Sequence, residues 1–190
     1  SRARYLRLRG RVLLQTERPA EAVPVFDEAL RLFRGGERRE LVARTLFDLA
    51  QAYAQSEAFG EAINYGLQCE NAINAGQLID ATLEVRVLSF LAGVFVAAGD
   101  LTSADLRIER AKRLAEDIAE PRAVGNLYFN LAVTRQREGD PEGALAFARK
   151  ALAAYEQMNV PAHIGSVWNT IGWIYKERRH DKPAGEEADK

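Results

Sequence analysis

The chain contains a single cysteine, Cys69, and no apolar run that approaches the roughly 20 residues of a membrane span. An internal disulfide is therefore impossible, so the covalent framework of small secreted domains is absent and a reducing compartment, the cytoplasm, is expected. We expect no membrane partner. The chain opens on Ser1 without a methionine or a visible signal peptide, which indicates a segment excised from a longer protein.

Residues and motifs typical of catalytic, metal-binding or phosphate-binding sites are also rare. His163 and His180 are seventeen residues apart, and no C-x-x-C, H-x-x-x-H or glycine-rich phosphate loop occurs. Gly35 and Gly36 stand at the end of an expected helix, where glycine serves as a cap. The sequence therefore predicts no catalytic site, no metal site and no cofactor.

Lysine is also rare, because 21 of the 26 basic residues are arginine. The net charge is −1, so no global field attracts nucleic acid or a membrane. The charge is uneven, however: residues 1–50 carry eleven arginines against seven acids, and residues 51–190 carry fifteen basic residues against twenty acids. No nucleic-acid-binding motif accompanies the basic end, so nucleic acid is not an expected partner of this segment.

What the chain does have is a fourteen-residue unit that occurs five times, at 9–22, 49–62, 91–104, 131–144 and 171–184. Successive copies follow at 40, 42, 40 and 40 residues, and such a fixed period indicates a repeat architecture. Each copy has a small residue in second place and an alanine twelve residues later. The small residues are Gly10, Ala50, Ala92, Ala132 and Gly172, and the alanines are Ala22, Ala62, Ala104, Ala144 and Ala184.

Apolar residues recur at helical spacing, as in Leu46, Leu49, Ala50 and Tyr53, and strand alternation is almost absent. Asp100 and Asp140-Pro141 have the form of helix starts, and Pro24 should kink or delay the helix that contains it. We predict helix pairs at 2–15 with 20–34, 38–55 with 59–75, 79–98 with 101–117, 121–138 with 141–158, and a last helix at 162–178.

The repeated positions have a packing role. Two antiparallel helices approach at about 8–10 Å, and their closest points accept only small side chains. A further small residue follows each alanine by seven positions, at Ala29, Cys69, Ala111 and Ala151, which makes Cys69 a buried, inert thiol. Large residues are expected to fill the remaining space, at Leu6, Leu46, Leu88, Tyr128 and Trp168, and at Leu13, Tyr53, Phe95 and Tyr175.

This pattern resembles the tetratricopeptide repeat over essentially the whole chain, in a long-period variety found in bacterial transcription regulators, other signalling proteins and kinesin light chains. Arg9 and Arg135 depart from the family's apolar and aromatic positions. The resemblance implies an all-α fold, a right-handed α-solenoid of antiparallel helix pairs. It also implies one repeat domain over 1–190, with repeats at 2–36, 38–77, 79–118, 121–159 and 162–190, the last incomplete.

In that family the first helix of each pair lines a concave groove, and the resemblance therefore implies a protein- or peptide-binding surface. Arginine suits carboxylate recognition, asparagine can bond an extended backbone, and exposed aromatics can anchor a partner. The expected groove residues are Arg4, Arg7, Arg11, Arg44, Phe47, Arg86, Phe90, Asn126, Phe129, Asn130, Asn169 and Trp173.

Several alternatives stay open at this point. The arginines also fit an ordinary solvated face, and the aromatics also fit packing within the repeats. The favoured function is a non-catalytic scaffold or sensor module of a larger bacterial signalling or regulatory protein, which binds an extended acidic or mixed segment. Homo-oligomerisation through the ends of the array, or the sensing of a small ligand by a transcription regulator, are the alternatives.

Overall fold

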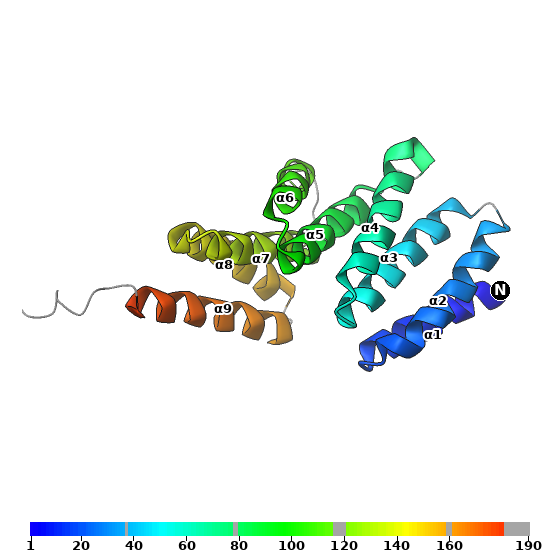
Figure 1. Ribbon diagram of the computed structural model, residues 1–190, viewed down its shortest axis with the longest axis horizontal. Coiled ribbons are helices and arrows are strands. Elements are labelled where there is room, and N and C mark those ends of the chain that lie inside the picture. Colours follow the sequence, from blue (N-terminus) through cyan, green and yellow to red (C-terminus); the bar gives the residue numbers. More distant parts are fainter. Residues whose placement is uncertain (37, 78–79, 116–120, 159–160, 181–190) are drawn as a thin grey trace, which may run out of the picture. The chain divides into compact units, whose positions relative to one another are not determined.

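The computed structural model describes residues 1–36, 38–77, 80–115, 121–158 and 161–180 (Figure 1). In these residues every regular element is helical. The chain divides into two compact units, Ser1–Ala111 and Lys112–Lys190, which we describe separately.

The first unit contains helices α1 (Arg2–Gln15), α2 (Pro19–Arg34), α3 (Arg39–Gln55), α4 (Phe59–Ala72) and α5 (Ala81–Ala98), and most of α6 (Leu101–Ala115). A π-helical turn, η1 (Ile73–Gln77), extends α4. Each helix from α1 to α4 packs against the next one in the chain. The second unit contains α7 (Pro121–Arg137), α8 (Pro141–Met158) and α9 (Pro161–His180), in which α8 packs against both α7 and α9.

The predicted helix boundaries agree with the structure to within a few residues. Asp100 and Asp140 cap α6 and α8 as expected, since their carboxylates accept hydrogen bonds from the backbone N–H of Ser103 at 3.0 Å and Gly143 at 2.9 Å. Pro24 does not delay α2, because that helix already begins at Pro19 and continues through Pro24 to Arg34. The ends of the expected helices 79–98 and 101–117 fall partly outside the described residues.

The small repeated residues lie at contacts between helices, as the repeat predicted. A Cβ atom built on Gly10 in α1 would lie 2.5 Å from Cε1 of Phe26 in α2, so this crossing requires glycine. Cys69 and the alanines at the second-helix positions are fully buried: Ala22, Ala29, Ala62, Ala104, Ala111, Ala144 and Ala151. Ala184 lies outside the described residues.

The last helix departs from the packing rule. Trp168 and Tyr175 of α9 were expected to fill the space between two helices, but both are exposed, and so is Gly172 between them. Their counterparts Leu88 and Phe95 in α5 are buried. The expectation was wrong for α9 because α8 covers the neighbouring face of that helix, where Val167, Ile171 and Ile174 join the core of the second unit.

Helix α5 is long and apolar enough to cross a membrane by length and composition, and more than half of it is buried inside the protein. The core helix of a soluble protein satisfies the same criteria, so this single helix is weak support for a membrane span.

Candidate protein-interaction surface

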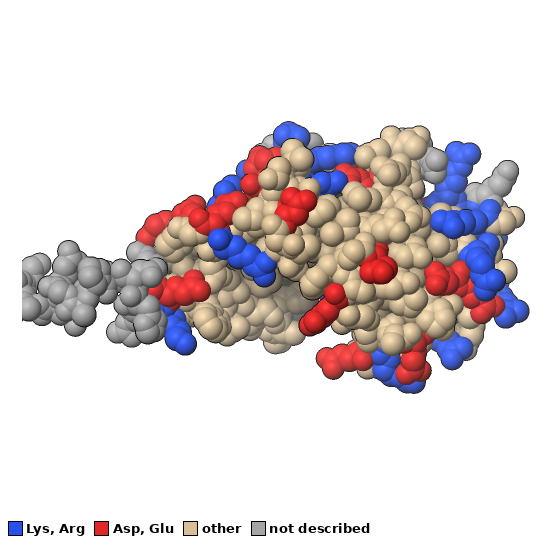
Figure 2. Space-filling view, in the orientation of Figure 1, with Lys and Arg blue, Asp and Glu red and all other residues tan. Residues whose placement is uncertain are grey.

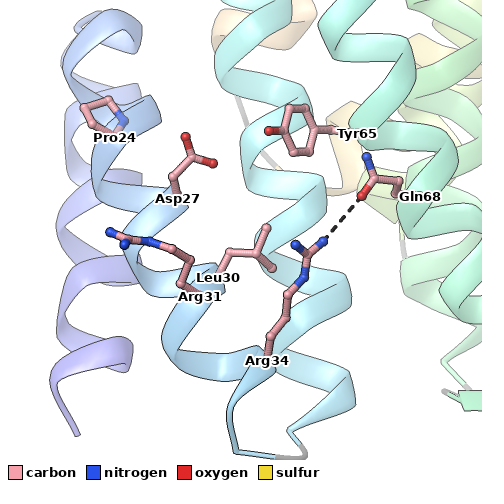
Figure 3. A pocket seen from close by; sticks show the side chains of 7 residues that line it. All are labelled: Pro24, Asp27, Leu30, Arg31, Arg34, Tyr65 and Gln68. Carbon is pink, nitrogen blue, oxygen red and sulfur yellow. Dashed lines mark hydrogen bonds between the residues drawn. The ribbon is translucent and has the colours of Figure 1, made fainter.

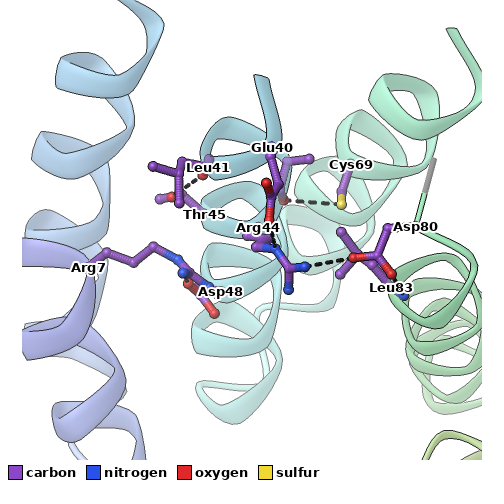
Figure 4. A network of polar contacts seen from close by, with 10 residues as sticks. Arg7, Glu40, Leu41, Arg44, Thr45, Asp48, Cys69, Asp80 and Leu83 are labelled. Atoms are coloured by element: carbon purple, nitrogen blue, oxygen red, sulfur yellow. Dashed lines mark hydrogen bonds and ion pairs between the residues drawn. The ribbon is translucent and has the colours of Figure 1, made fainter. Parts of the chain in front are cut away.

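In the first unit, ion pairs link α1, α3 and the start of α5, which are the first helices of successive helix pairs. The ion pair between α1 and α3 is the more buried one. Arg7 Nε donates to the Asp48 carboxylate at 2.5 Å (Figure 4). Only 16% of the Arg7 side chain and 7% of the Asp48 side chain are exposed. Burial raises the pKa of Asp48, and the attraction of Arg7 opposes that rise without cancelling it. Arg7 is therefore committed to neutralising a buried carboxylate inside the protein.

Arg44 forms the next link, from α3 to the start of α5. Its guanidinium donates to Glu40 at 2.9 Å and to Asp80 at 2.6 Å (Figure 4). Asp80 also caps α5 by accepting the N–H of Leu83 at 2.9 Å, so one carboxylate fixes both the helix start and the arginine. The Cys69 thiol donates to the backbone carbonyl of Ala43 at 3.2 Å beside this network.

The aromatic residues of α3 and α5 pack on each other. Phe47 is buried, and its ring meets Phe90 edge to face with centroids 5.4 Å apart. The Arg86 guanidinium lies over the Phe47 ring at 5.5 Å. Arg7 and Arg86 thus both act on Asp48, and Phe90 packs on the neighbouring Phe47, so packing within the repeats accounts for Phe47.

Arg4 and Arg11 are exposed on α1, on the same side of the helix as Arg7. Arg4 forms no hydrogen bond or ion pair with any residue that the structure describes. In Figure 2 the basic side chains gather at the end of the first unit that carries α1 and α2. The excess of arginine in the first 50 residues is therefore displayed on the surface of that unit.

Of the expected groove residues in the second unit, some are bonded or packed inside the unit and others are exposed to solvent. Asn126 accepts a hydrogen bond from the Tyr155 hydroxyl at 2.7 Å, and Phe129 packs against the core of the unit. Asn130 is half-buried in α7. Asn169 and Trp173 are exposed on α9, where the Lys176 ammonium lies 5.0 Å from the Trp173 ring centroid.

A pocket of about 570 Å³ lies between the second helices α2 and α4 of the first unit (Figure 3). Arg34 donates to Gln68 at 3.5 Å across it, and Tyr65 stacks on Tyr53. The Asp27 side chain has no hydrogen bond within the described residues, and partial burial raises its pKa against the attraction of Arg31 and Arg34. The small-ligand alternative stays a prediction, and this pocket is where it would apply. The lining residues are Pro24, Asp27, Leu30, Arg31, Arg34, Tyr65 and Gln68.

The thiol of Cys69 and the imidazole of His163 both contact neighbouring residues of the protein. Burial raises the pKa of the Cys69 thiol to about 12, so the nucleophilic thiolate is suppressed. The ring centroids of His163 and Tyr155 are 4.9 Å apart, and the pKa of His163 is lowered by burial and by Arg122. Within the described residues no three His, Cys, Asp or Glu side chains are arranged to hold a metal ion.

The sequence analysis did not predict an exposed apolar surface on α1. Tyr5, Leu8 and Val12 of α1 are exposed at 65%, 59% and 56% and form a stripe on the outer side of the helix. Their i, i+3, i+7 spacing was a visible signal. It was missed because these residues fall outside the repeated positions that define the packing between helices.

Comparison with known proteins agrees with this architecture. A family model described as tetratricopeptide repeat matches residues 1–75 and 83–157. Among solved structures, BtubC (BKLC) from P. vanneervenii is similar, with a TM-score of 0.71 at 17% sequence identity over 90% of this chain and 70% of that one. No curated protein sequence matches the chain. The structural likeness supports an all-α solenoid of paired helices, as predicted, and the family match covers most of the sequence: the chain belongs to the tetratricopeptide repeat family.

Proposed function

We propose that this chain is a protein-binding module that holds an extended acidic segment of its partner against the first-helix surface of the first unit. Tetratricopeptide repeats generally mediate protein–protein interaction or scaffolding. The observation that carries the acidic specificity is the exposure of Arg4 and Arg11 beside the Arg7–Asp48 pair. Arg7 forms the ion pair with the buried Asp48, and Arg11 adds only an electrostatic attraction to it, so in this proposal the exposed guanidiniums of Arg4 and Arg11 meet carboxylates of the ligand.

In this proposal two ion pairs and one cation–π contact make the surface rigid. Arg7, Arg44 and Arg86 join consecutive first helices through Asp48, Asp80 and Phe47. A surface that is fixed before binding loses less conformational entropy when a partner docks. In this proposal Arg7, Arg44, Phe47 and Arg86 support the surface, and Arg4, Arg11 and part of Phe90 contact the partner.

The second unit offers a different kind of contact. Trp173 is exposed on α9 near Asn169, which combines a large apolar face with an amide that can bond a peptide backbone. Exposed tryptophan is a frequent anchor in protein interfaces. We include these two residues as a second contact point for a partner, independent of the arginines.

The proposal extends to the setting of this module. The single buried cysteine suits the reducing cytoplasm, and the long repeat period suits the regulatory and signalling proteins of bacteria in which such repeats occur. In this proposal the module binds its partner, and any catalysis belongs to another part of the larger protein.

The test is a direct titration. The probe is a fluorescein-labelled peptide in which glutamate alternates with proline and phenylalanine, because proline keeps it from forming a helix. Replacing Arg4 and Arg11 together by serine should weaken binding about threefold to tenfold and flatten its salt dependence, since exposed charge pairs contribute about 0.2–1 kcal/mol each.

The matched control is Arg113→Ser with Arg149→Ser, which removes two exposed arginines from other helices and changes the net charge equally. Wild-type and control proteins should bind alike. Equal binding by wild type and the Arg4/Arg11 variant, or equal weakening in the control, refutes the proposed surface.

Self-association is a second candidate, supported by one specific observation on α9. Trp168 and Tyr175 are exposed on either side of Gly172, and a Cβ atom on Gly165 or Gly172 would meet nothing within 4 Å. None of these four residues is charged, so a second copy related by a two-fold axis meets no like charge along this stripe, and the glycines allow close approach.

Sedimentation at two protein concentrations tests this candidate. A dimer that forms with increasing concentration and is lost on Trp168→Ala with Tyr175→Ala supports it. The control is Leu106→Ala, which removes an exposed apolar side chain from α6. A protein that stays monomeric at both concentrations excludes self-association through α9.

A further inference from the structure

The outer side of α1 carries an apolar stripe between two rows of arginine. Tyr5, Leu8 and Val12 form the stripe, and each is more than half exposed. At 100° per residue, Arg4 and Arg11 lie along one flank of the stripe, and Arg2 and Arg9 along the other. Helix α1 contains five arginines and no aspartate or glutamate. An exposed apolar face with one sign of charge on both flanks marks an interaction site.

The repeat shows what kind of element covers this face. The positions of Tyr5 and Val12 correspond to Thr45 and Ala52 in α3, Val87 and Val94 in α5, and Val167 and Ile174 in α9. All six of these side chains are buried. In each case the helix packs against the second helix of the pair before it: α2 for α3, α4 for α5 and α8 for α9. The equivalent face of α1 therefore has the position and geometry to receive a helix.

Arg9 determines the charge of that helix. Its counterparts Leu49, Leu91 and Ile171 are buried apolar residues, whereas Arg9 is exposed. A helix that covers the stripe also covers Arg9, and a covered guanidinium without a counter-charge is strongly unfavourable. A carboxylate opposite Arg9, with others opposite Arg4 and Arg11, removes that cost.

We propose that the outer face of α1 is a docking site for an acidic amphipathic helix of a partner protein. The partner's apolar residues at helical spacing lie on Tyr5, Leu8 and Val12, and its acidic residues flank them and pair with Arg4, Arg9 and Arg11. This surface adjoins the first-helix groove and shares Arg4 and Arg11 with it, but it takes a helix in place of an extended segment, and its contacts are mainly apolar. A second copy of the chain is disfavoured here, since two α1 helices would bring their arginines together.

A basic amphipathic helix also suits an anionic membrane, and the observations favour the helix partner over it. The opposite side of α1 is already packed, with Ala3, Leu6 and Leu13 buried. Three residues make a narrow apolar strip, whereas the repeat gives three instances in which this face meets a helix. The lipid surface is therefore an outcome of the test and not part of the proposal.

The test uses the whole chain and an eighteen-residue peptide with leucines at helical spacing and glutamates on both flanks of the leucine stripe. The control peptide has the same composition in an order that scatters the leucines around the helix. We expect the first peptide to bind and gain helical circular dichroism. We also expect binding to fall about tenfold or more in the triple variant Tyr5→Ala, Leu8→Ala, Val12→Ala, because these residues form the centre of the contact.

Three controls keep the outcome specific. Leu32→Ala with Leu106→Ala removes exposed apolar side chains elsewhere and should bind as wild type does. Arg9→Glu should weaken binding of the acidic peptide and leave the protein folded, because Arg9 is exposed and glutamate is a good helix former. The triple alanine variant carries no charge change, so its binding of the extended glutamate–proline peptide should be unaffected, which separates this inference from the groove proposal.

The inference is overturned if the amphipathic peptide binds wild type and the triple variant equally, or if it does not bind. It is also overturned if the triple substitution instead abolishes binding to phosphatidylserine–phosphatidylcholine vesicles, or abolishes self-association in sedimentation. The first result would assign the stripe to a membrane, and the second to a copy of the chain.

Discussion

The Arg7–Asp48 pair offers the sharpest test of how the first unit is held together. Replacing Arg7 by methionine keeps most of the side-chain volume and removes the guanidinium. Asp48 then stays buried without its closest counter-charge, and breaking a buried pair in this way typically costs about 3–5 kcal/mol. Arg11 and Arg86 also attract Asp48, so we expect about 2–3 kcal/mol at pH 7, below that range.

The pH dependence of this loss follows from the pKa of Asp48. Burial already raises that pKa in the folded protein, and the loss of Arg7 raises it further. The folded variant then binds a proton that the unfolded chain, with an aspartate pKa near 3.9, does not bind at the same pH. Stability from this proton is fully present below the unfolded value and is lost as the pH rises through the folded pKa. The deficit of Arg7→Met should therefore shrink as the pH falls from 7 to 5.

Urea denaturation followed by circular dichroism at pH 7 and pH 5 measures both effects. The control is Arg4→Met, which removes an exposed arginine from the same side of α1 and should change the free energy of unfolding by less than about 0.5 kcal/mol. A cost for Arg7→Met no larger than that of Arg4→Met, or one that does not shrink at pH 5, would refute the assigned role of the pair.

The remaining predictions concern packing and reactivity. Gly10→Ala should lower the free energy of unfolding by about 1–3 kcal/mol, because the new Cβ atom would meet the buried Phe26 ring. Gly172→Ala, at the same repeat position, should raise it by about 0.5–1 kcal/mol, because the new Cβ atom meets nothing within 4 Å and alanine is the better helix former. Urea denaturation of both variants checks that the two effects have opposite signs. Gly99→Ala should cost about 1 kcal/mol in the same assay, because Gly99 has a φ of +84°. Cys69 should resist Ellman's reagent until denaturant is added; rapid reaction of the native protein contradicts its burial.

Much of the fold could be predicted because the repeat encodes local contacts. The small residues at Gly10 and Ala22 predicted a close crossing of two helices, and α1 and α2 cross there with Phe26 against Gly10. Asp100 and Asp140 predicted helix starts because a cap depends on neighbours within three residues. Trp168 and Tyr175 were misplaced by the same rule, since the rule assumes a covering helix that the described residues do not include.

The candidate site was harder to predict because its state depends on partners far along the chain. Arg7 and Asp48 are forty-one residues apart, and Arg44 and Asp80 thirty-six. Helical period shows that these side chains share a surface, but it does not show whether a guanidinium is bonded to a carboxylate or left to solvent. The structure supplies that difference for Arg7 and Arg4, which the sequence treated alike.

The sequence by itself determined the helix pairs, their boundaries and the small contacts between them, because these depend on periodicity and on side-chain size at fixed spacing. Only the tertiary structure decided which arginines form ion pairs within the protein and which faces of α1 and α9 stay exposed. The physical reason is that charge pairing and burial are properties of neighbours in space, and the same position of the repeat is buried in α5 and exposed in α9.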